Sequence, residues 1–468
     1  MALSIYSTLS RTQAPFAPIE PNHVRMYVCG VTVYDYCHIG HGRTFVAFDV
    51  VRRWLEASGM KVTFVRNITD VDDKIIRRAA ERGITTTELT EEFGRAMQED
   101  MLALGCLAPT HEPRATDYIP EMLGLIEKLE QKGYAYQGSD GDVDFAVRKF
   151  ENYGRLSGKS IDDLQSGARV DVAAGKRDPL DFVLWKSAKP GEPQWESKWG
   201  CGRPGWHIEC SAMSAKILGD TFDIHGGGPD LIFPHHENEI AQSEAANGKP
   251  FAKYWMHNAF LNIDNKKMSK SLGNFFTVRE ISEKYDLQVL RFFMLSAHYR
   301  SPLNFSADLM EASKNGLERI LTGMEKLREM EAKVSGDAMT AEEQENQKKA
   351  MELVAKYEAA MDDDFNTADA ISAIFELIKL SNSTVSETST KAYVSWMKNE
   401  IQRLCDVMGI ITEKKKEVLD SEVEDLIAQR QAARKAKNFA LADEIRGKLL
   451  DMGIVLEDTR EGVKWKRA

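Results

Sequence analysis

The sequence predicts an α/β protein with a doubly wound parallel sheet, split by an insertion and followed by an all-α helical bundle and a small C-terminal domain. Strand and helix patterns alternate strictly over the first 82 residues, which is typical of a Rossmann-like sheet with crossover helices. From about residue 306 the apolar period becomes helical throughout, which indicates a bundle. A length of 468 residues also exceeds that of one domain.

The first half of the sheet begins with residues 24–29, which alternate β-branched and aromatic side chains as a strand does. Ligands of doubly wound sheets bind beyond the carboxyl ends of the strands. We therefore expect Cys29, His38 and Thr69 to lie at the binding edge. The other segments expected before residue 132 are a strand over 61–68 and helices over 43–58, 72–82, 87–103 and 112–131.

A polar, glycine-punctuated stretch then interrupts the sheet, and it includes a short strand over 141–147. The parallel sheet is expected to resume near Gly205. Its expected segments are helices over 207–218 and from His235 onward, strands over 222–226 and 255–261, and a loop over 265–274.

The C-terminal part predicts bundle helices, a charged linker over 412–421, one or two further helices within 423–450, and a short basic tail. The bundle helices are expected over 309–330, 341–360, 367–380 and 391–408, with a loop over 381–390. We therefore expect domains over 1–112, 113–200, 201–305, 306–411 and 412–468.

Composition excludes several classes of protein. A net charge of −11 argues against general nucleic-acid binding, although a local basic patch remains possible. Six scattered cysteines form no disulfide framework and fit a reducing, cytoplasmic setting. The N-terminus lacks the pattern of a signal peptide, and no run of about 18 apolar residues predicts a membrane span.

The tetrapeptide His38-Ile39-Gly40-His41 lies between a predicted strand and a predicted helix. Gly40 lets the backbone approach a ligand, and backbone N–H groups at a helix start favour anions. Two imidazoles at i and i+3 can donate to a phosphate. Taken alone, the motif is equally compatible with two surface histidines near a turn.

A basic loop, Lys267-Met268-Ser269-Lys270-Ser271, follows far along the chain. Its lysines and hydroxyls can neutralise a polyphosphate as its charge redistributes. A solvated lysine-rich turn is the plain alternative. The pairing of this loop with the histidine tetrapeptide, in this order, favours a nucleotide site.

The stretch from Gly226 to Glu244 predicts half of a metal site. His235 and Glu239 are four residues apart, so on a helix their side chains share a face. Cys29 and Cys210 are the candidate thiolate ligands, with Cys201 as a rival. His236 and Glu237 are rivals too, but we expect them to point elsewhere on the helix. The remaining cysteines are expected to be small buried hydrophobes: Cys37, Cys106 and Cys405.

These motifs together resemble cysteinyl-tRNA synthetases, a family of class I aminoacyl-tRNA synthetases. The resemblance rests on the two loops above and on four further segments, and it covers nearly the whole chain. Those segments are TDVDDKI (69–75), GRPGWHIECSAM (202–213), DIHGGGPDLIFPHHENEIAQS (223–243) and MDDDFNTADAI (361–371).

The resemblance implies ATP-dependent ligation of L-cysteine to tRNA(Cys) through a cysteinyl-adenylate. It implies one Zn²⁺ per chain, held by Cys29, Cys210, His235 and Glu239, and Mg²⁺ bound with ATP. We hypothesise that zinc selects the substrate's thiolate over serine, because apolar pockets separate such analogues by only about 1–3 kcal/mol. No editing domain is then needed.

The resemblance also assigns roles to individual residues. The catalytic residues would be His38, His41, Lys267 and Lys270, and ATP would also contact Gly40 and Ser269. Gly30, Thr69, Trp206 and Asp230 would hold the amino acid, although Asp230 could touch the ribose instead. The glycines at 226–228 would leave room for adenine.

Basic residues near the C-terminus predict contacts with RNA, together with one aromatic residue suited to base stacking. A solvated helix face is nearly as good an interpretation of the first cluster. The two clusters comprise Arg430, Arg434, Lys435 and Lys437, then Arg460, Lys464, Trp465, Lys466 and Arg467.

Two rival functions remain. A cysteine ligase that passes the adenylate to a small amine, such as an aminosugar, would share the motifs but should lack the extra C-terminal domain. A non-catalytic tRNA-binding or zinc-regulatory protein is disfavoured by the intact loops. We expect a monomer with L-cysteine, ATP and tRNA(Cys) as partners and no membrane contact.

Overall fold

The computed structural model describes residues 2–161, 175–264, 266–267, 275–413, 420–436, 438–452, 454–459 and 462–467. The chain forms two compact units, Met1–Thr412 and Glu413–Ala468. Among the helices within the described ranges, none is long and apolar enough to cross a membrane.

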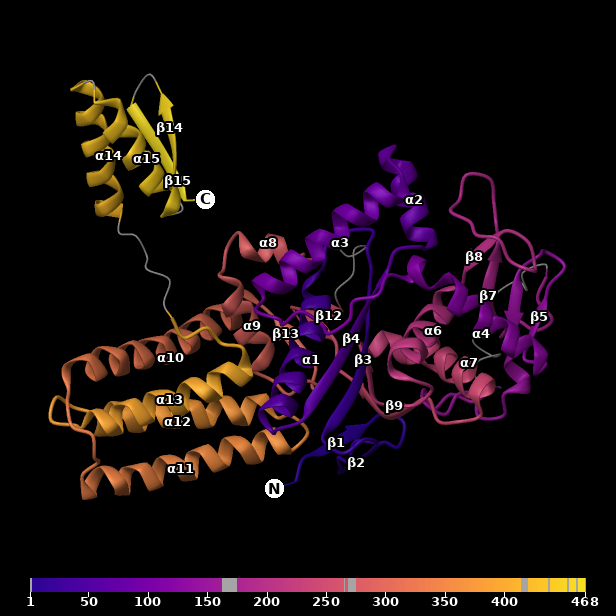
Figure 1. The fold of residues 1–468 in the computed structure, drawn as a ribbon, viewed down its shortest axis with the longest axis horizontal. Helices are drawn as coiled ribbons and strands as arrows, with labels where there is room; N and C mark the ends of the chain where they lie inside the picture. The colour runs from indigo at the N-terminus through magenta and orange to yellow at the C-terminus, as the bar shows by residue number, and fades with distance from the viewer. Residues whose placement is uncertain are drawn as a thin grey trace. The chain divides into compact units, whose positions relative to one another are not determined.

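The centre of the larger unit is a four-stranded parallel sheet in the order β10-β9-β3-β4 (Figure 1). Two of its strands precede the insertion and two follow it, which confirms the predicted doubly wound sheet. The strands are β3 (His23–Thr32), β4 (Lys61–Thr69), β9 (Phe222–Gly227) and β10 (Ala252–His257).

Helices cover both faces of this sheet, so its strands are buried on both sides. Successive side chains of a strand point to opposite faces. Met26 and Val28 of β3 therefore join a core with α1 (Ile39–Ala57), α3 (Thr86–Ala103) and the bundle. Tyr27 and Cys29 of the same strand join a second core with α4 (Ile119–Gln131), α6 (Trp206–Leu218) and α7 (Glu237–Asn247).

Helix α1 begins earlier than its predicted start at Arg43. His38 is the N-cap, and His38 and His41 each accept a hydrogen bond from the other's backbone N–H. This reciprocal cap satisfies two N–H groups that a helix start otherwise leaves without partners. The histidine tetrapeptide is therefore the first turn of the helix. The next helix, α2, spans Asp73–Arg82.

The insertion consists of a short 3₁₀ turn (Ala115–Tyr118), α4 and an antiparallel sheet in the order β5-β6-β7-β8. Strand β8 lies beyond residue 200, so the inserted sheet reaches further than the predicted boundary. The strands are β5 (Ala135–Gln137), β6 (Val143–Phe145), β7 (Phe182–Ser187) and β8 (Gly202–Pro204).

The predicted strand over 255–261 is wrong: the chain leaves the parallel sheet after His257. A second small sheet follows, in the order β12-β11-β13. Residues 258–260 leave the parallel sheet. Arg43 of α1 fixes their position, because its guanidinium donates a hydrogen bond to the Phe260 carbonyl at 3.0 Å. The small sheet comprises β11 (Leu261–Ile263), β12 (Lys266–Lys267) and β13 (Leu303–Phe305).

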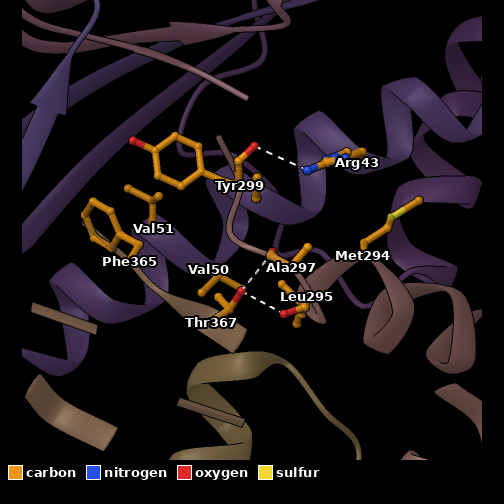
Figure 2. Close-up of a pocket in the computed structure, with 10 residues that line it drawn as sticks. Arg43, Val50, Val51, Met294, Leu295, Ala297, Tyr299, Phe365 and Thr367 are labelled. Atoms are coloured by element: carbon orange, nitrogen blue, oxygen red, sulfur yellow. Dashed lines mark hydrogen bonds between the residues drawn. The ribbon is translucent and has the colours of Figure 1, made fainter. Parts of the chain in front are cut away.

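A small cavity lies between α1 and the bundle, lined by Arg43, Val50, Tyr299 and Thr367 among others (Figure 2). Besides Phe260, the Arg43 guanidinium donates to the carbonyls of His298, Tyr299 and Ser301. Thr367 donates to the Leu295 carbonyl at 2.8 Å. Hydrogen bonds to backbone carbonyls thus connect α1 with the segment that leads into the bundle.

Four helices form the predicted bundle and lie alongside one another in Figure 1. They are α10 (Ala307–Lys333), α11 (Ala341–Asp362), α12 (Thr367–Thr384) and α13 (Lys391–Met408). Elements outside the prediction are the hairpin β1 (Ser4–Ser7) and β2 (Thr12–Pro15), and the helices α8 (Val278–Ser282) and α9 (Leu287–Leu295).

The smaller unit packs α14 (Asp420–Lys435) and α15 (Phe439–Asp451) around Val423, Ile445 and Leu449. Its end is not a loose basic tail, contrary to our expectation. Instead β14 (Ile454–Thr459) and β15 (Gly462–Arg467) form an antiparallel hairpin.

Candidate functional site

A cleft opens beyond the carboxyl ends of the parallel strands, where ligands of doubly wound sheets bind. It encloses about 1510 Å³, including its open mouth. Several predicted site residues line it: Cys29, Gly30, His38, Gly40, His41, Trp206 and Asp230. Lys74, Asn258 and Phe260 line it as well, and sequence reasoning had not selected them.

The two histidines of the tetrapeptide lie at one wall of the cleft, and each ring accepts a hydrogen bond from the backbone of the other residue. The Nδ1 of His38 accepts from the His41 N–H at 3.1 Å, and the Nδ1 of His41 accepts from the His38 N–H at 3.3 Å. The rings stack with centroids 3.5 Å apart. Because both Nδ1 atoms accept, each neutral ring carries its proton on Nε2. Both rings can therefore present Nε2–H donors at a helix N-terminus, which suits phosphate oxygens.

The basic loop falls largely outside the described residues. Ser269 and Lys270 lie in the range 268–274, which the structure does not describe. Lys267 belongs to β12, where it pairs with Asn262 of β11.

Four predicted metal-ligating residues meet behind this cleft. Their donor atoms all lie within 4.8 Å of one another, and all four side chains are buried. Cys29 comes from the end of β3, Cys210 from α6, His235 from the turn before α7, and Glu239 from α7 itself. The Sγ atoms of Cys29 and Cys210 are 3.7 Å apart, and Glu239 Oε1 lies 2.6 Å from His235 Nε2.

The electrostatics of this cluster suit a bound cation. Burial alone would raise the pKa of Cys210, but hydrogen bonds with Cys29 and His235 lower it to about 6. Burial also opposes ionisation of Glu239, yet the neighbouring His225 and His235 hold its pKa well below the usual value. A thiolate and a carboxylate thus share a dry site. Such groups are ligands for which zinc has a strong preference.

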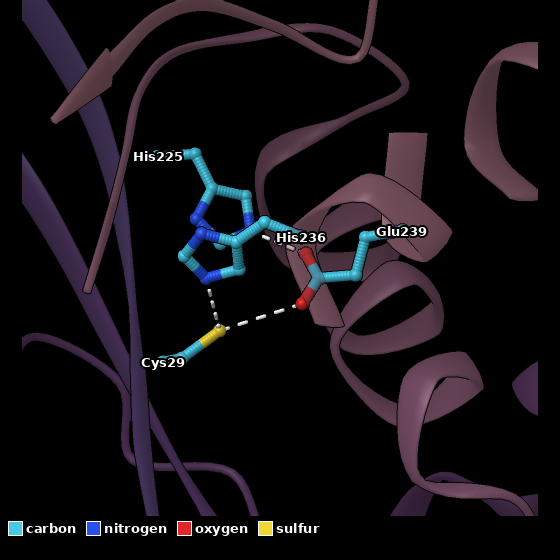
Figure 3. A group of neighbouring side chains, drawn as sticks. All are labelled: Cys29, His225, His236 and Glu239. Atoms are coloured by element: carbon cyan, nitrogen blue, oxygen red, sulfur yellow. Dashed lines mark hydrogen bonds and ion pairs between the residues drawn. The ribbon is translucent and has the colours of Figure 1, made fainter. Parts of the chain in front are cut away.

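The prediction for His236 is wrong. Its side chain points into the cluster, with Nε2 3.3 Å from the Cys29 sulfur, as Figure 3 shows. His236 has helical backbone angles (φ −68°, ψ −34°), so its side chain leaves the helix about 100° round from that of His235. This adjacent side of the helix is buried and also faces the cluster. A second candidate set therefore overlaps the first and consists of Cys29, His225, His236 and Glu239. Glu237 does point away, and it accepts from the backbone N–H of Gly154 at 2.9 Å.

The geometry favours the first set as the metal ligands. Glu239 Oε1 faces both His235 and Cys29, whereas Oε2 is held by His225. The first set also adjoins the cleft, since Cys29 lines it and the cleft-lining Trp206 stacks on His235 with centroids 4.3 Å apart. Two sulfurs, one nitrogen and one oxygen form a donor set that zinc accepts.

Three further histidines surround the ligands, and sequence reasoning missed them. His207 Nδ1 lies 3.0 Å from His235 Nδ1, His225 contacts Glu239, and His257 Nε2 lies 2.7 Å from His236 Nδ1. Two signals could have found them. His207 and Cys210 are three apart on one helix face, and His225 and His257 lie near the carboxyl ends of neighbouring parallel strands.

The residues predicted to contact the amino-acid substrate differ in how exposed they are to the cleft. Gly30 must be glycine, because a Cβ there would lie 1.6 Å from the Asn67 carbonyl oxygen. Trp206 is 39% exposed and Asp230 is also exposed, both at the cleft. Thr69 is buried, and its hydroxyl donates to Glu209 at 2.8 Å. Its oxygen can therefore act toward a substrate only as an acceptor.

The expectation that residues 226–228 leave room for adenine needs correction. A Cβ on Gly226 would collide with the ring of Phe48, and one on Gly227 would lie 2.9 Å from the ring of His236. These two glycines permit close packing inside the protein. Of the three, Gly228 lines the cleft.

Solved structures share this fold at low sequence identity. Methionyl-tRNA synthetase from Mycobacterium tuberculosis, in complex with methionyl-adenylate, matches with a TM-score of 0.59 and 15% identity over 82% of this chain and 89% of that one. A leucyl-tRNA synthetase (LeuRS) from Agrobacterium radiobacter in a ternary complex matches with a TM-score of 0.60 and 11% identity, over 84% and 85%.

The family model of the class I (C) tRNA synthetase catalytic domain matches residues 15–315, which makes the chain a class I tRNA synthetase. Models of the DALR domain and of the cysteinyl-tRNA ligase anticodon binding domain match residues 356–412 and 417–465. Cysteine–tRNA ligases from Lachnospira eligens and Clostridioides difficile are 57% and 54% identical, over 100% and 99% of this chain and 100% of each relative. The chain belongs to the cysteinyl-tRNA ligase family.

Proposed function

We propose that this chain ligates L-cysteine to tRNA(Cys) in two steps, the first of which consumes ATP. The carboxylate of cysteine attacks the α-phosphate of ATP and pyrophosphate leaves. A terminal ribose hydroxyl of the tRNA then attacks the acyl carbonyl of the adenylate, and AMP leaves. The observation that carries the proposal is the shared cleft: Cys29 of the buried cluster and His38 and His41 of the helix turn line the same cavity. A sulfur-binding site and a phosphate-binding site therefore face one substrate.

Zinc would be held by Cys29, Cys210, His235 and Glu239. When bound, it supplies a soft Lewis acid that binds a thiolate and discriminates against a protonated alcohol. The chain's own residues set the position of the amino acid. Gly30 lets the backbone approach, and the Trp206 ring lies over His235 at the cleft.

The phosphates of ATP would meet the Nε2–H groups of His38 and His41 and the N–H groups of the first turn of α1, where Gly40 exposes the backbone. Lys267, Ser269 and Lys270 would complete the charge compensation, with Mg²⁺ on the phosphates. Asp230 lies at the cleft and suits the substrate ammonium or a ribose hydroxyl. Thr69 would accept from that ammonium, because its own proton is given to Glu209.

The smaller unit would bind the anticodon loop. Arg434 and Lys435 are exposed at the end of α14, and Phe439 is 61% exposed at the start of α15. Cations with an exposed ring suit phosphates and unpaired bases. Arg430 is buried, so we remove it from the proposed contacts. Lys437 and Arg460, and the side chains of residues 464–467, lie outside the described structure.

A transfer assay separates this function from ligation to a small amine. Removing residues 413–468, which form the separate smaller unit, should leave cysteine-dependent ATP–pyrophosphate exchange intact and cripple charging of tRNA. Full charging by the shortened chain would show that the RNA reader lies elsewhere. Cysteine activation with transfer to an aminosugar and none to tRNA would favour the rival function.

Metal analysis tests the ligand set. We expect about one zinc per chain, greatly reduced in Cys210→Ser and retained in Cys201→Ser, a matched change at an exposed cysteine. Loss of zinc in His236→Gln but not in Cys210→Ser would instead select the second set. We also propose a cytoplasmic monomer, which sedimentation of the purified chain and cell fractionation would test.

A further inference from the structure

Three of the four proposed zinc ligands have an outer partner within the protein. The Cys29 sulfur lies 3.3 Å from His236 Nε2, and His235 Nδ1 lies 3.0 Å from His207 Nδ1. Glu239 Oε2 contacts His225 Nε2. Outer partners of this kind orient metal ligands and tune their charge.

Cys210 lacks such a donor. Besides the fellow ligands Cys29 and His235, its hydrogen-bond partner among the described residues is Asn67 Oδ1 at 3.6 Å. That oxygen already accepts from the Gly30 N–H at 2.9 Å, and the Asn67 amide donates to Thr69, which fixes its orientation. A metal-bound thiolate carries no proton. Asn67 Oδ1 therefore cannot stabilise Cys210 in that form, because an acceptor has nothing to donate.

Tyr27 stands where the missing donor would be. It precedes Cys29 by two residues on β3, so both side chains enter the core beneath α6 and α7. Its side chain is fully buried, and within the described part of the chain no partner meets hydrogen-bond geometry with its hydroxyl. Its ring meets that of His225 edge-on, with centroids 5.4 Å apart, and His225 contacts Glu239 of the cluster, so the Tyr27 hydroxyl is enclosed in the same core as both sulfurs. A buried hydroxyl without a partner costs about 1–3 kcal/mol.

We propose that the Tyr27 hydroxyl donates a hydrogen bond to the sulfur of Cys210 when zinc is bound, as a positioning residue that tunes the metal. This inference rests on the proposed function. Zn²⁺ with two thiolates, one carboxylate and a neutral imidazole carries a net charge of −1, and the thiolate of the substrate adds a further negative charge. A hydrogen bond donated to the Cys210 sulfur reduces the negative charge on that sulfur. It therefore favours binding of the substrate's thiolate.

The test replaces zinc by Co²⁺, whose sulfur-to-metal charge-transfer band reports the electron density on the thiolates. Tyr27→Phe should shift this band to lower energy and weaken metal retention against a chelator about 10-fold or more, within the range typical of outer-shell changes. The KM for cysteine should rise, while the KM for ATP stays unchanged. Tyr357→Phe is the matched control, because that fully buried hydroxyl donates to the Leu404 carbonyl in the bundle.

The outcomes separate the inference from the proposed function. A parent enzyme that binds neither Zn²⁺ nor Co²⁺ overturns the metal site itself. A parent enzyme that binds metal, with the same band and retention in Tyr27→Phe, overturns only the role of Tyr27. If Tyr27→Phe does not fold, 4-aminophenylalanine at position 27 keeps the ring and offers a weaker N–H donor. Its band should shift partway to lower energy, and an unshifted band would refute the hydrogen bond.

Discussion

The substitution Arg43→Lys tests how the first helix shapes the cleft. The Arg43 guanidinium is buried and donates to four backbone carbonyls, those of Phe260, His298, Tyr299 and Ser301. Burial lowers its pKa to about 10. The forked guanidinium serves several acceptors at once, whereas an ammonium on a flexible stem is a single point charge.

The expected magnitude follows from these contacts. The bonds to His298 and Tyr299 are both 3.4 Å long and weak, so Phe260 and Ser301 are the principal partners. Lysine can keep one of those two. Both bonds are partly buried, so losing the other one, with its charged donor, costs about 1–2 kcal/mol of unfolding free energy. Because Phe260 lines the cleft, we also expect the KM for ATP to rise about tenfold, which equals about 1.4 kcal/mol.

Two measurements check this prediction: urea unfolding, and cysteine-dependent ATP–pyrophosphate exchange without tRNA. Arg82→Lys is the control, because its ion pair with Glu92 is exposed to solvent and such pairs contribute little to stability. If Arg43→Lys unfolded at the same urea concentration as the parent chain and kept its exchange kinetics, the carbonyl contacts would not hold the cleft in shape.

Three further predictions concern other parts of the chain. Gly30→Ala should abolish cysteine activation, because its Cβ would lie 1.6 Å from a backbone oxygen; activity of the Gly30→Ala variant in the exchange assay would contradict this. Phe439→Ala should raise the KM for tRNA tenfold or more, because it removes base stacking worth about 1–3 kcal/mol. Leu450, on the same helix, is 62% exposed, and Leu450→Ala should leave this KM unchanged. Equal effects of the two substitutions would argue against stacking. Burial opposes ionisation of Glu343, but hydrogen bonds from Thr390 and Thr340 outweigh it and lower its pKa. Its contribution to stability is therefore present above the ordinary glutamate pKa and lost as pH falls through the lowered one. Glu343→Gln should flatten the acid limb of the stability profile, and an unchanged limb would refute that role.

Much of the candidate site could be predicted, because its residues stand in patterns that local physics constrains. The pair His235 and Glu239 was found from its spacing, and the structure brings both to Cys29 and Cys210. His236 could not be placed in the same way, because α7 is buried on more than one face, and the face next to that of His235 and Glu239 also meets the cluster. Helical spacing tells which residues share a face, but it does not tell which faces are covered by the rest of the fold.

The sequence by itself determined the alternation of strands and helices, the bundle, and the residues able to bind phosphate or metal, because these depend on local period and side-chain chemistry. Tertiary structure alone decided which histidines surround the candidate metal cluster and that Gly226 packs on Phe48. It also decided that Tyr27 shares the core of Cys29 and Cys210. Such contacts join residues as many as 210 positions apart, and the way the two faces of one sheet are covered determines which of those residues meet.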